Sequence, residues 1–214
     1  MLKIAVLISG AGSNLQAIMD AVARGEIDGR IAGVLSNRAD AYGLERAKAQ
    51  GIATAVITHG DFAERAAFDQ ALIRQIDAWD VDVVVLAGFM RILTAAFVGH
   101  YEGRLLNIHP SLLPRYKGLH THRRALEAGD LEHGCSVHYV TAELDGGPVI
   151  AQATIPVLPH DTEASLAARV HESEHRLYPQ VLAWLADGSL QYDAGRPRFR
   201  GQPLATPLQL PPSR

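Results

Sequence analysis

The chain is poor in cysteine, in long apolar runs and in excess charge of either sign, and each shortage excludes a class of protein. Its single cysteine, Cys135, excludes an intramolecular disulfide and any zinc site built from several cysteines. The best apolar stretch, Val83 to Met90, is far shorter than the roughly 20 residues of a membrane helix. The net charge of −3 argues against a nucleic-acid-binding surface, which would be strongly basic.

The remaining composition is that of an ordinary globular protein. The chain has 214 residues, of which 48% are hydrophobic and 20% charged, which fits one domain or one domain with a tail. The segment from Met1 to Ile8 has the lysine and apolar residues of a small signal peptide, but it is too short and no small-residue cleavage site follows. We expect a buried first strand and a cytoplasmic protein, where a lone thiol is unremarkable.

Apolar runs alternate with helical patterns in the first half of the chain. Strands are expected at 3–8, 30–36, 54–58, 81–87 and 104–108, and helices at 14–24, 42–50, 62–78 and 94–101. Asp61, with Glu64 three residues later, is the expected N-cap of the third helix. Nearly all-apolar strands that alternate with helices predict a doubly wound, mostly parallel α/β sheet of the Rossmann-like kind.

The pattern changes after residue 109. Segments 134–140 and 149–157 read as strands with no long helix between them, which predicts an antiparallel extension of the fold. A long helix is expected over 162–186, with Asp161 or Thr162 as its cap. The last twenty residues, 195–214, contain five prolines and little periodicity, so we expect them to be irregular.

A glycine-rich segment, Ser9–Leu15, joins the first strand to the first helix. Glycines leave backbone N–H groups accessible, the helix N-terminus is partially positive, and Ser13 and Asn14 add polar side chains, so the segment suits a phosphate. Leu15 stands where the dinucleotide fingerprint has its third glycine, which favours a monophosphate over NAD. Two alternatives stay open here: a tight turn that binds nothing, and an NADP-dependent oxidoreductase in which Arg38 holds the extra phosphate.

Three polar residues later in the chain form a candidate catalytic set. Asn107 and His109 lie two residues apart at the end of an expected strand, so their side chains share a side. Asp145 begins an Asp-Gly-Gly-Pro turn whose glycines let a carboxylate approach a ligand or a histidine. Ligands of open α/β sheets bind outside the carboxyl ends of strands, where these residues are expected.

The set suits acyl transfer to an amine. The Asn107 amide and a protonated His109 can donate hydrogen bonds to the oxygen of a tetrahedral intermediate. Asp145 can favour the cationic form of His109 and, with water, accept the protons that the amine loses. No serine or cysteine nucleophile is evident, which favours direct transfer. Each residue could instead have a local role, as a cap, a strand-end histidine and a turn residue.

Five motifs occur together in one order: Ser9–Asn14, Leu86–Leu93, Leu106–Pro114 (Leu-Asn-Ile-His-Pro-Ser-Leu-Leu-Pro), Gly118–His122 and Glu143–Val149. In this order and spacing they closely resemble the glycinamide ribonucleotide formyltransferases, a folate-dependent family of purine biosynthesis and one-carbon metabolism. The resemblance covers about residues 1–190. It implies a transferase that moves the formyl group of 10-formyltetrahydrofolate, a cosubstrate, to the amino group of glycinamide ribonucleotide, with no metal.

The resemblance also implies roles for individual residues. The catalytic trio is Asn107, His109 and Asp145. The residues expected to bind the ribonucleotide are Gly12, Ser13, Asn14, His171, Glu172, Ser173 and Glu174. The residues expected to bind folate are Arg65, Met90, Arg91, Ile92, Leu93, Asn107, Thr141, Ala142, Glu143, Leu144 and Asp145.

The resemblance further predicts the organisation of the chain. A single formyltransferase domain is expected over 1–192, with a phosphate-binding half to about 103, a folate and catalytic half from about 104, and a proline-rich tail over 193–214. A homodimer is compatible with the family. The partners are expected to be the two small substrates, with no nucleic acid and no membrane.

Relatives and other classes of protein remain as alternatives. Methionyl-tRNA formyltransferase and formyltetrahydrofolate deformylase share the strand motif, but the first usually reads Arg-Gly-Ala-x-Pro where this chain has Lys117–His122, and the second has a histidine in place of Pro110. A non-catalytic phosphate-binding protein would bind without turnover. His120 and His122, on an expected extended loop, could bind zinc with His138 or Asp145, and His171–His175 spells the H-E-x-x-H pattern of zinc proteases. More simply, the loop containing His120 borders the folate or shapes the cleft.

Overall fold

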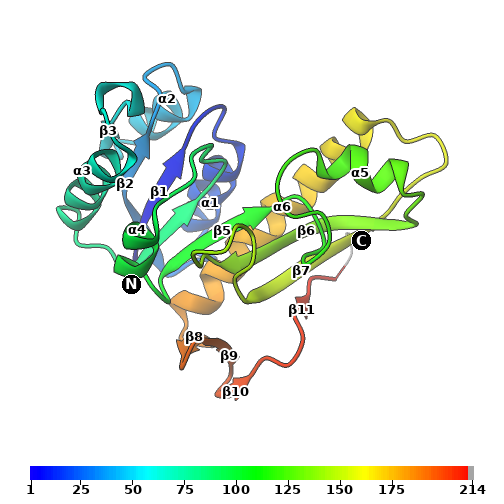
Figure 1. The fold of residues 1–214 in the computed structure, drawn as a ribbon. Helices are drawn as coiled ribbons and strands as arrows, with labels where there is room; N and C mark the ends of the chain where they lie inside the picture. The colour runs from blue at the N-terminus through cyan, green and yellow to red at the C-terminus, as the bar shows by residue number, and fades with distance from the viewer. Residues whose placement is uncertain (212–214) are drawn as a thin grey trace. The chain divides into compact units, whose positions relative to one another are not determined.

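The computed structural model describes residues 1–211 and divides into two compact units, Met1–Asn107 and the residues from Ile108 onward (Figure 1). The predicted tail residues 212–214 lie outside the described part. None of the helices within residues 1–211 is long and apolar enough to cross a membrane. The assignment of a phosphate-binding half and a folate half to the chain stays a prediction.

The first unit is built on a parallel sheet with the strand order β3-β2-β1-β4-β5. Its strands are β1 (Leu2–Ile8), β2 (Gly29–Ser36), β3 (Thr54–Val56), β4 (Val83–Leu86) and β5 (Leu105–His109), the last of which contains the division between the units. The residues of β1 from Ile4 to Ile8 are fully buried, as expected for a central strand covered on both faces. The mostly parallel α/β sheet that the sequence predicts is confirmed.

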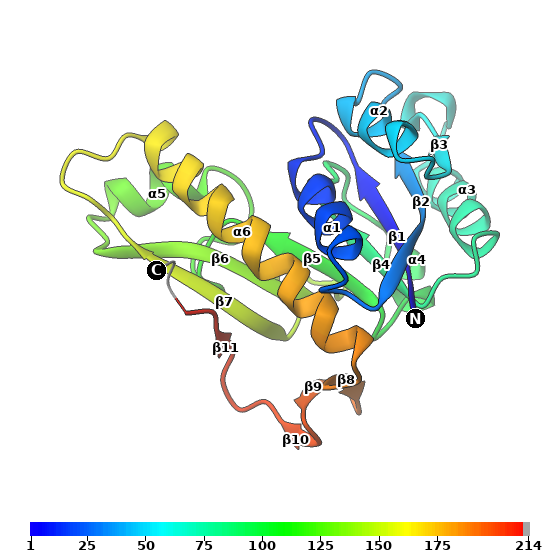
Figure 2. The ribbon, with the colours of Figure 1, turned by 180° about the vertical axis from the view of Figure 1, so that it is seen from behind.

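Helices cover both faces of this sheet (Figures 1 and 2). Helices α1 and α2 pack against each other, as do α3 and α4. Their bounds are α1 (Ser13–Ala23), α2 (Tyr42–Ala49), α3 (Arg65–Asp77) and α4 (Ala95–His100). The turn from β1 into α1 lies at the carboxyl end of β1, and ligands of such folds bind at the carboxyl ends of strands.

The predicted start of the third helix is wrong. Residues His59–Asp61 form a short 3₁₀ helix and α3 begins only at Arg65, with Glu64 in the N-cap position and no side-chain cap. Phe62 has extended backbone angles and its ring packs edge-to-face against Phe68, with ring centres 5.8 Å apart. The aromatic contact holds Phe62 outside the helix, so the Asp61–Glu64 capping pattern is not used.

The second unit is built around an antiparallel pair and one long helix. Strand β6 (Glu132–Tyr139) pairs antiparallel with β7 (Val149–Pro156), as predicted. The helix α6 (Glu163–Ala186) packs against both strands (Figure 2). Thr162, one of the two predicted caps, is its N-cap, and its side chain accepts from the Ser165 N–H. The buried core between these elements includes Val137, Tyr139, Ile150, Ala151, Leu166, Val170, Leu177 and Val181.

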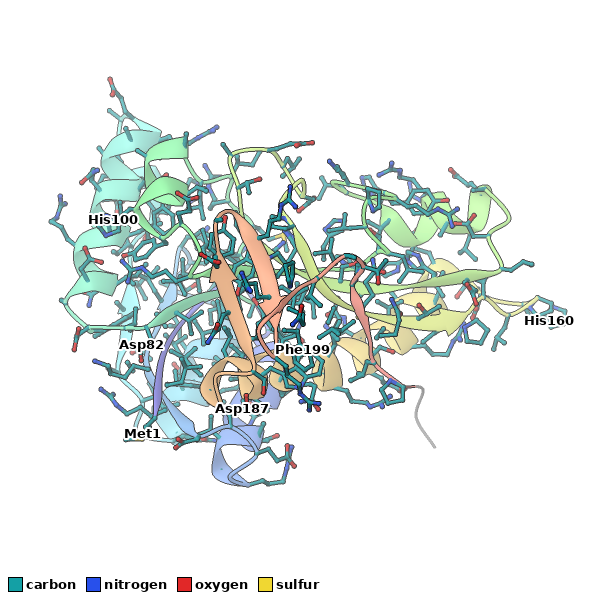
Figure 3. All side chains as sticks on the ribbon, turned by 90° about the horizontal axis from the view of Figure 1, so that it is seen from below. Met1, Asp82, His100, His160, Asp187 and Phe199 are labelled. Atoms are coloured by element: carbon teal, nitrogen blue, oxygen red, sulfur yellow. The ribbon has the colours of Figure 1, made fainter. Side chains whose placement is uncertain are left out.

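The expectation of an irregular tail is wrong for residues 196–199, 202–203 and 208–209, which form short strands. Strands β8 (Leu190–Asp193), β9 (Arg196–Phe199) and β10 (Gln202–Pro203) form a small antiparallel sheet beyond α6, and Figure 3 labels Phe199 on it. Strand β11 (Leu208–Gln209) then pairs parallel with β7. Pro197, in β9, has no N–H to donate, but its carbonyl oxygen accepts from the Leu204 N–H at 3.0 Å.

Candidate active site

The predicted phosphate loop lies between β1 and α1, and its backbone is held from α2. The Gly10 carbonyl accepts from the Gly43 N–H at 3.0 Å, and the Ala11 carbonyl accepts from Nε of Arg46 at 2.9 Å. Helix α1 begins at Ser13 with no acidic residue in its first turn, so the positive end of its dipole has no carboxylate of its own helix to neutralise it. These features are those of an anion site.

Gly12 has a backbone conformation and a neighbour that only glycine tolerates. Its φ is +70°, in the left-handed region. A Cβ atom at this position would lie 2.7 Å from the Cα of Gly43. The close approach of Gly12 to α2 explains why the loop needs a glycine here, whether or not a phosphate is bound. The neighbouring Asn14 is buried and Ser13 is partly exposed.

Most of the predicted folate residues of the first unit are exposed. Met90 and Ile92, 69% and 62% exposed, lie in the irregular segment between β4 and α4, together with Arg91 and Leu93. Arg65 is exposed at the first position of α3. Apolar side chains that remain in water at a loop are what a flat aromatic ligand would cover.

His109 and Asp145 meet in the second unit. The Nδ1 atom of His109 lies 3.5 Å from Oδ2 of Asp145, and both side chains are more than nine-tenths buried. Asn107 lies two residues before His109 on β5, so the two side chains are on the same side of the strand, and Asn107 is half-buried. The structure thus brings two of the three predicted catalytic residues into direct proximity and places the third on the same strand as one of them.

The other ring nitrogen of His109 is hydrogen-bonded. Its Nε2–H donates to the carbonyl of Tyr116 at 2.8 Å. The ring of His109 therefore lies between a backbone carbonyl and a carboxylate, both of which can accept hydrogen bonds. The sequence did not indicate Tyr116, whose φ of +54° is unusual for a residue with a side chain.

A tight turn between β6 and β7 presents Asp145. The residue has a φ of +48°, a conformation that aspartate tolerates better than most residues. A Cβ atom on Gly147 would lie 1.8 Å from the Tyr139 carbonyl, so only glycine lets the turn close against the end of β6. The preceding residues from Thr141 to Leu144 form the exposed part of the turn, and Glu143 pairs with Lys117 at 2.7 Å.

His138 is a neighbour of Asp145 that the catalytic prediction missed. Its Nε2 atom lies 3.8 Å from Oδ1 of Asp145, and its Nδ1–H donates to the Tyr139 carbonyl at 2.9 Å. Burial lowers the pKa of His138, which therefore favours the neutral ring. The carboxylate of Asp145 thus has a histidine near each oxygen. A histidine within a predicted strand was the available signal.

The predicted ribonucleotide residues of α6 divide between surface and interior. His171 and Glu172 are exposed, whereas Ser173 and Glu174 are buried. His171 Nδ1 lies 3.6 Å from a Glu174 carboxylate oxygen, and its ring lies edge-to-face on that of His175, with centres 5.3 Å apart.

The prediction that His120 and His122 lie on an extended loop is wrong. Helix α5 (Thr121–Glu127) begins directly after His120, so His122 is helical rather than on an extended loop. The Nδ1 atom of His122 lies 3.1 Å from Nε2 of His133, a buried residue of β6. Within residues 1–211 there is no group of three or more histidine, cysteine, aspartate or glutamate side chains arranged to hold a metal ion.

Comparison with known proteins places the chain among enzymes of one kind. Residues 2–182 match the model of the formyl transferase family. The chain is 59% identical to phosphoribosylglycinamide formyltransferase of Escherichia coli over 95% of the chain and 96% of that protein. It is 49% identical to the Haemophilus influenzae protein of the same name over 89% of the chain and 90% of that protein.

Solved structures agree with these relatives. The phosphoribosylglycinamide formyltransferase of Coxiella burnetii, solved in complex with CHES, is 53% identical and superposes with a TM-score of 0.94 over 98% of this chain and 99% of that chain. Glycinamide ribonucleotide transformylase 1 of Symbiobacterium toebii is 47% identical, with a TM-score of 0.89 over 93% and 94% of the two chains. The chain belongs to the formyl transferase family.

Proposed function

We propose that the protein transfers the formyl group of 10-formyltetrahydrofolate to the amino group of glycinamide ribonucleotide, giving formylglycinamide ribonucleotide and tetrahydrofolate in purine biosynthesis. The observation that carries the proposal is the buried contact between His109 and Asp145, with Asn107 on the same strand as His109. The relatives' names supply both the formyl chemistry and the ribonucleotide acceptor.

The proposed transfer consists of an addition followed by an elimination. The amine nitrogen attacks the formyl carbon, a C–N bond forms, and the formyl oxygen becomes an oxyanion. The oxyanion collapses, the bond between the formyl carbon and N10 of the folate breaks, and the electron pair stays on N10. The amine loses one proton and N10 gains one, so no net proton is consumed.

Each residue of the trio has a part in these steps. The Asn107 amide donates to the developing oxyanion, which would be the largest stabilising effect. Asp145 holds His109 as a cation and, through water, accepts the proton from the amine. His109 is the second candidate donor to the oxyanion, and its Nε2–H is bonded to the Tyr116 carbonyl. In this proposal, hydrogen-bond donors of the protein stabilise the developing negative charge, and no metal ion is assigned a role.

The proposed phosphate-binding residues of the acceptor are Gly12, Ser13 and Asn14, at the N-terminus of α1. The proposed acceptor-binding residues of α6 are His171, Glu172, Ser173 and Glu174. The proposed donor-binding residues are Arg65 and Met90–Leu93 in the first unit and the turn 141–145 in the second. The partners are these two small molecules. A cytoplasmic location and a homodimer remain part of the proposal.

The decisive experiment measures release of tetrahydrofolate from 10-formyltetrahydrofolate, with and without glycinamide ribonucleotide. Release that requires the ribonucleotide, together with the formylated product, establishes the transferase. Release without the ribonucleotide would show a deformylase instead. Binding of the ribonucleotide with no release under either condition would show a non-catalytic phosphate-binding protein.

A further inference from the structure

Ser9 connects the proposed phosphate loop to the proposed donor segment, Met90–Leu93. It is buried at the end of β1 and directly precedes the glycines of the loop. Its Oγ atom accepts a hydrogen bond from the Met90 N–H at 2.8 Å. Its own N–H donates to the Gly88 carbonyl at 3.1 Å. One residue of the first unit is therefore bonded twice to the segment that follows β4.

Asn37 determines which way the Ser9 hydroxyl points. The Ser9 Oγ–H donates to Oδ1 of Asn37 at 2.5 Å, and both side chains are buried. An amide oxygen can only accept, so the hydroxyl hydrogen is committed to Asn37. The lone pairs of Ser9 are then directed away from Asn37 and accept from Met90. The buried pair acts as one fixed acceptor for the backbone of the donor segment.

A buried carboxylate holds the other end of the same segment. Oδ2 of Asp69, on α3, accepts from the Thr94 N–H at 2.6 Å, and Asp69 is only 2% exposed. Its Oδ1 atom is buried and has no hydrogen-bond partner within residues 1–211. Such an atom costs free energy and calls for a functional explanation. The hydrogen bond from the Thr94 N–H to Asp69 holds one end of the segment, and Ser9 holds the other end at Met90. The side chains of Met90 and Ile92 remain exposed.

We propose that Ser9, oriented by Asn37, is a positioning residue for the formyl donor, and that Asp69 is the second anchor of the same segment. This inference rests on the proposed function, because it takes Met90–Leu93 as a donor-binding segment. The phosphate loop has separate supports from Gly43 and Arg46. Loss of the Ser9 hydroxyl should therefore weaken donor binding selectively, although Ser9 itself adjoins the acceptor loop.

The test compares Ser9→Ala and Asn37→Leu with two controls in steady-state assays of the full-length protein. The KM for the formyl donor, the KM for the ribonucleotide acceptor, kcat and Tm are measured for each variant. Asn37→Asp keeps an oxygen acceptor for the Ser9 hydroxyl. Ser36→Ala removes a second buried serine hydroxyl, at the end of β2, which accepts from the Arg38 N–H at 3.1 Å.

We expect both test variants to raise the donor KM about fivefold, the factor that one net hydrogen bond represents. Their kcat and acceptor KM should stay within about twofold of wild type, and Asn37→Asp and Ser36→Ala should resemble wild type in both KM values. Unchanged donor KM in the test variants would overturn the inference, as would equal changes in both KM values or the same donor effect in Ser36→Ala. A wild-type protein without ribonucleotide-dependent transfer would instead refute the proposed function.

Direct binding distinguishes misplacement of the donor segment from simple loss of folding. Tetrahydrofolate, the proposed product, is titrated into each variant at a temperature at least about 10 °C below its Tm, where the variant is folded. We expect the Kd of Ser9→Ala to rise by the same factor as its donor KM. A Kd equal to that of wild type in a folded variant would contradict the positioning role.

Discussion

Oδ2 of Asp145 lies 3.5 Å from Nδ1 of His109 and also accepts the Gly118 N–H at 2.9 Å. One carboxylate oxygen therefore contacts the proposed catalytic histidine and the loop that follows it. That loop returns to the histidine through the Tyr116 carbonyl. Asp145 therefore contacts both the ring of His109 and the loop that holds that ring.

Replacing Asp145 by Asn should remove the charge and keep an oxygen near His109. Because a neutral amide does not stabilise the imidazolium or accept the amine proton, we expect kcat to fall about 10²- to 10⁴-fold. The fall should appear in single-turnover formyl transfer, with Tm changed by only a few degrees. Asp80→Asn is the matched control: Asp80 also has a left-handed backbone, with φ of +50°, but pairs with Lys3 at the surface. A similar loss of activity in both variants would contradict the role of Asp145.

Gly12→Ala should damage acceptor binding. The new Cβ atom would lie 2.7 Å from the Cα of Gly43, at a φ of +70°, so the loop or α2 must shift. We expect a stability loss of about 1–3 kcal/mol and a raised KM for glycinamide ribonucleotide, with a smaller effect on the donor KM. Gly10→Ala is the matched control, because a Cβ atom there meets nothing within 4 Å. An unchanged acceptor KM in a folded Gly12→Ala protein would argue against the phosphate loop.

The parts of the fold that the sequence predicts well are those decided by local patterns. The apolar strands β1, β2, β4 and β5 and the cap of α6 at Thr162 follow from sequence pattern and capping chemistry. The tail was missed for two reasons: β11 pairs with the distant β7, which no local pattern records, and β8, β9 and β10 are too short to show a periodicity. The start of α3 was missed because the contact between Phe62 and Phe68 depends on the folded backbone and not on a capping pattern.

The sequence likewise indicated some residues of the candidate site and missed others. Asn107 and His109 could be identified from their spacing at a strand end, and Asp145 from its turn. Neither Tyr116 nor His138 was indicated as a neighbour of the trio, because one acts through a backbone carbonyl and the other lies on a buried strand. Backbone acceptors have no sequence signature. The Ser9–Asn37 hydrogen bond, between residues 28 positions apart, is also a purely tertiary contact.

Acid should destabilise the second unit through His133. Burial lowers its pKa from an ordinary value of 6.5 to about 4, and the adjacent His122 has a pKa lowered mainly by burial as well. Between pH 6.5 and 4 the unfolded chain binds more protons than the folded one, so stability falls as the pH falls through this range. His133 alone accounts for at most about 3 kcal/mol.

The measurement is the free energy of unfolding in urea at pH 7 and pH 5, for wild type and His133→Gln. Because glutamine does not titrate, the variant should lose less stability between the two pH values than wild type does. His160→Gln is the control, since His160 is exposed beyond β7 (Figure 3) and its replacement should leave the pH dependence as it is. An identical pH dependence in wild type and His133→Gln would show that His133 is not the responsible group.

The small sheet of the tail should stabilise the protein through Phe199. Its ring lies edge-to-face on that of Trp184, on α6, with ring centres 5.1 Å apart. Phe199→Ala should lower the free energy of unfolding by about 2 kcal/mol, less than for a fully buried ring because Phe199 is partly exposed. Phe199→Leu should recover about half of the loss, and Leu131→Ala, at a side chain 83% exposed, should cost almost nothing. Urea unfolding measures all three, and a Phe199→Ala protein as stable as wild type would mean that the tail sheet does not pack on α6 in solution.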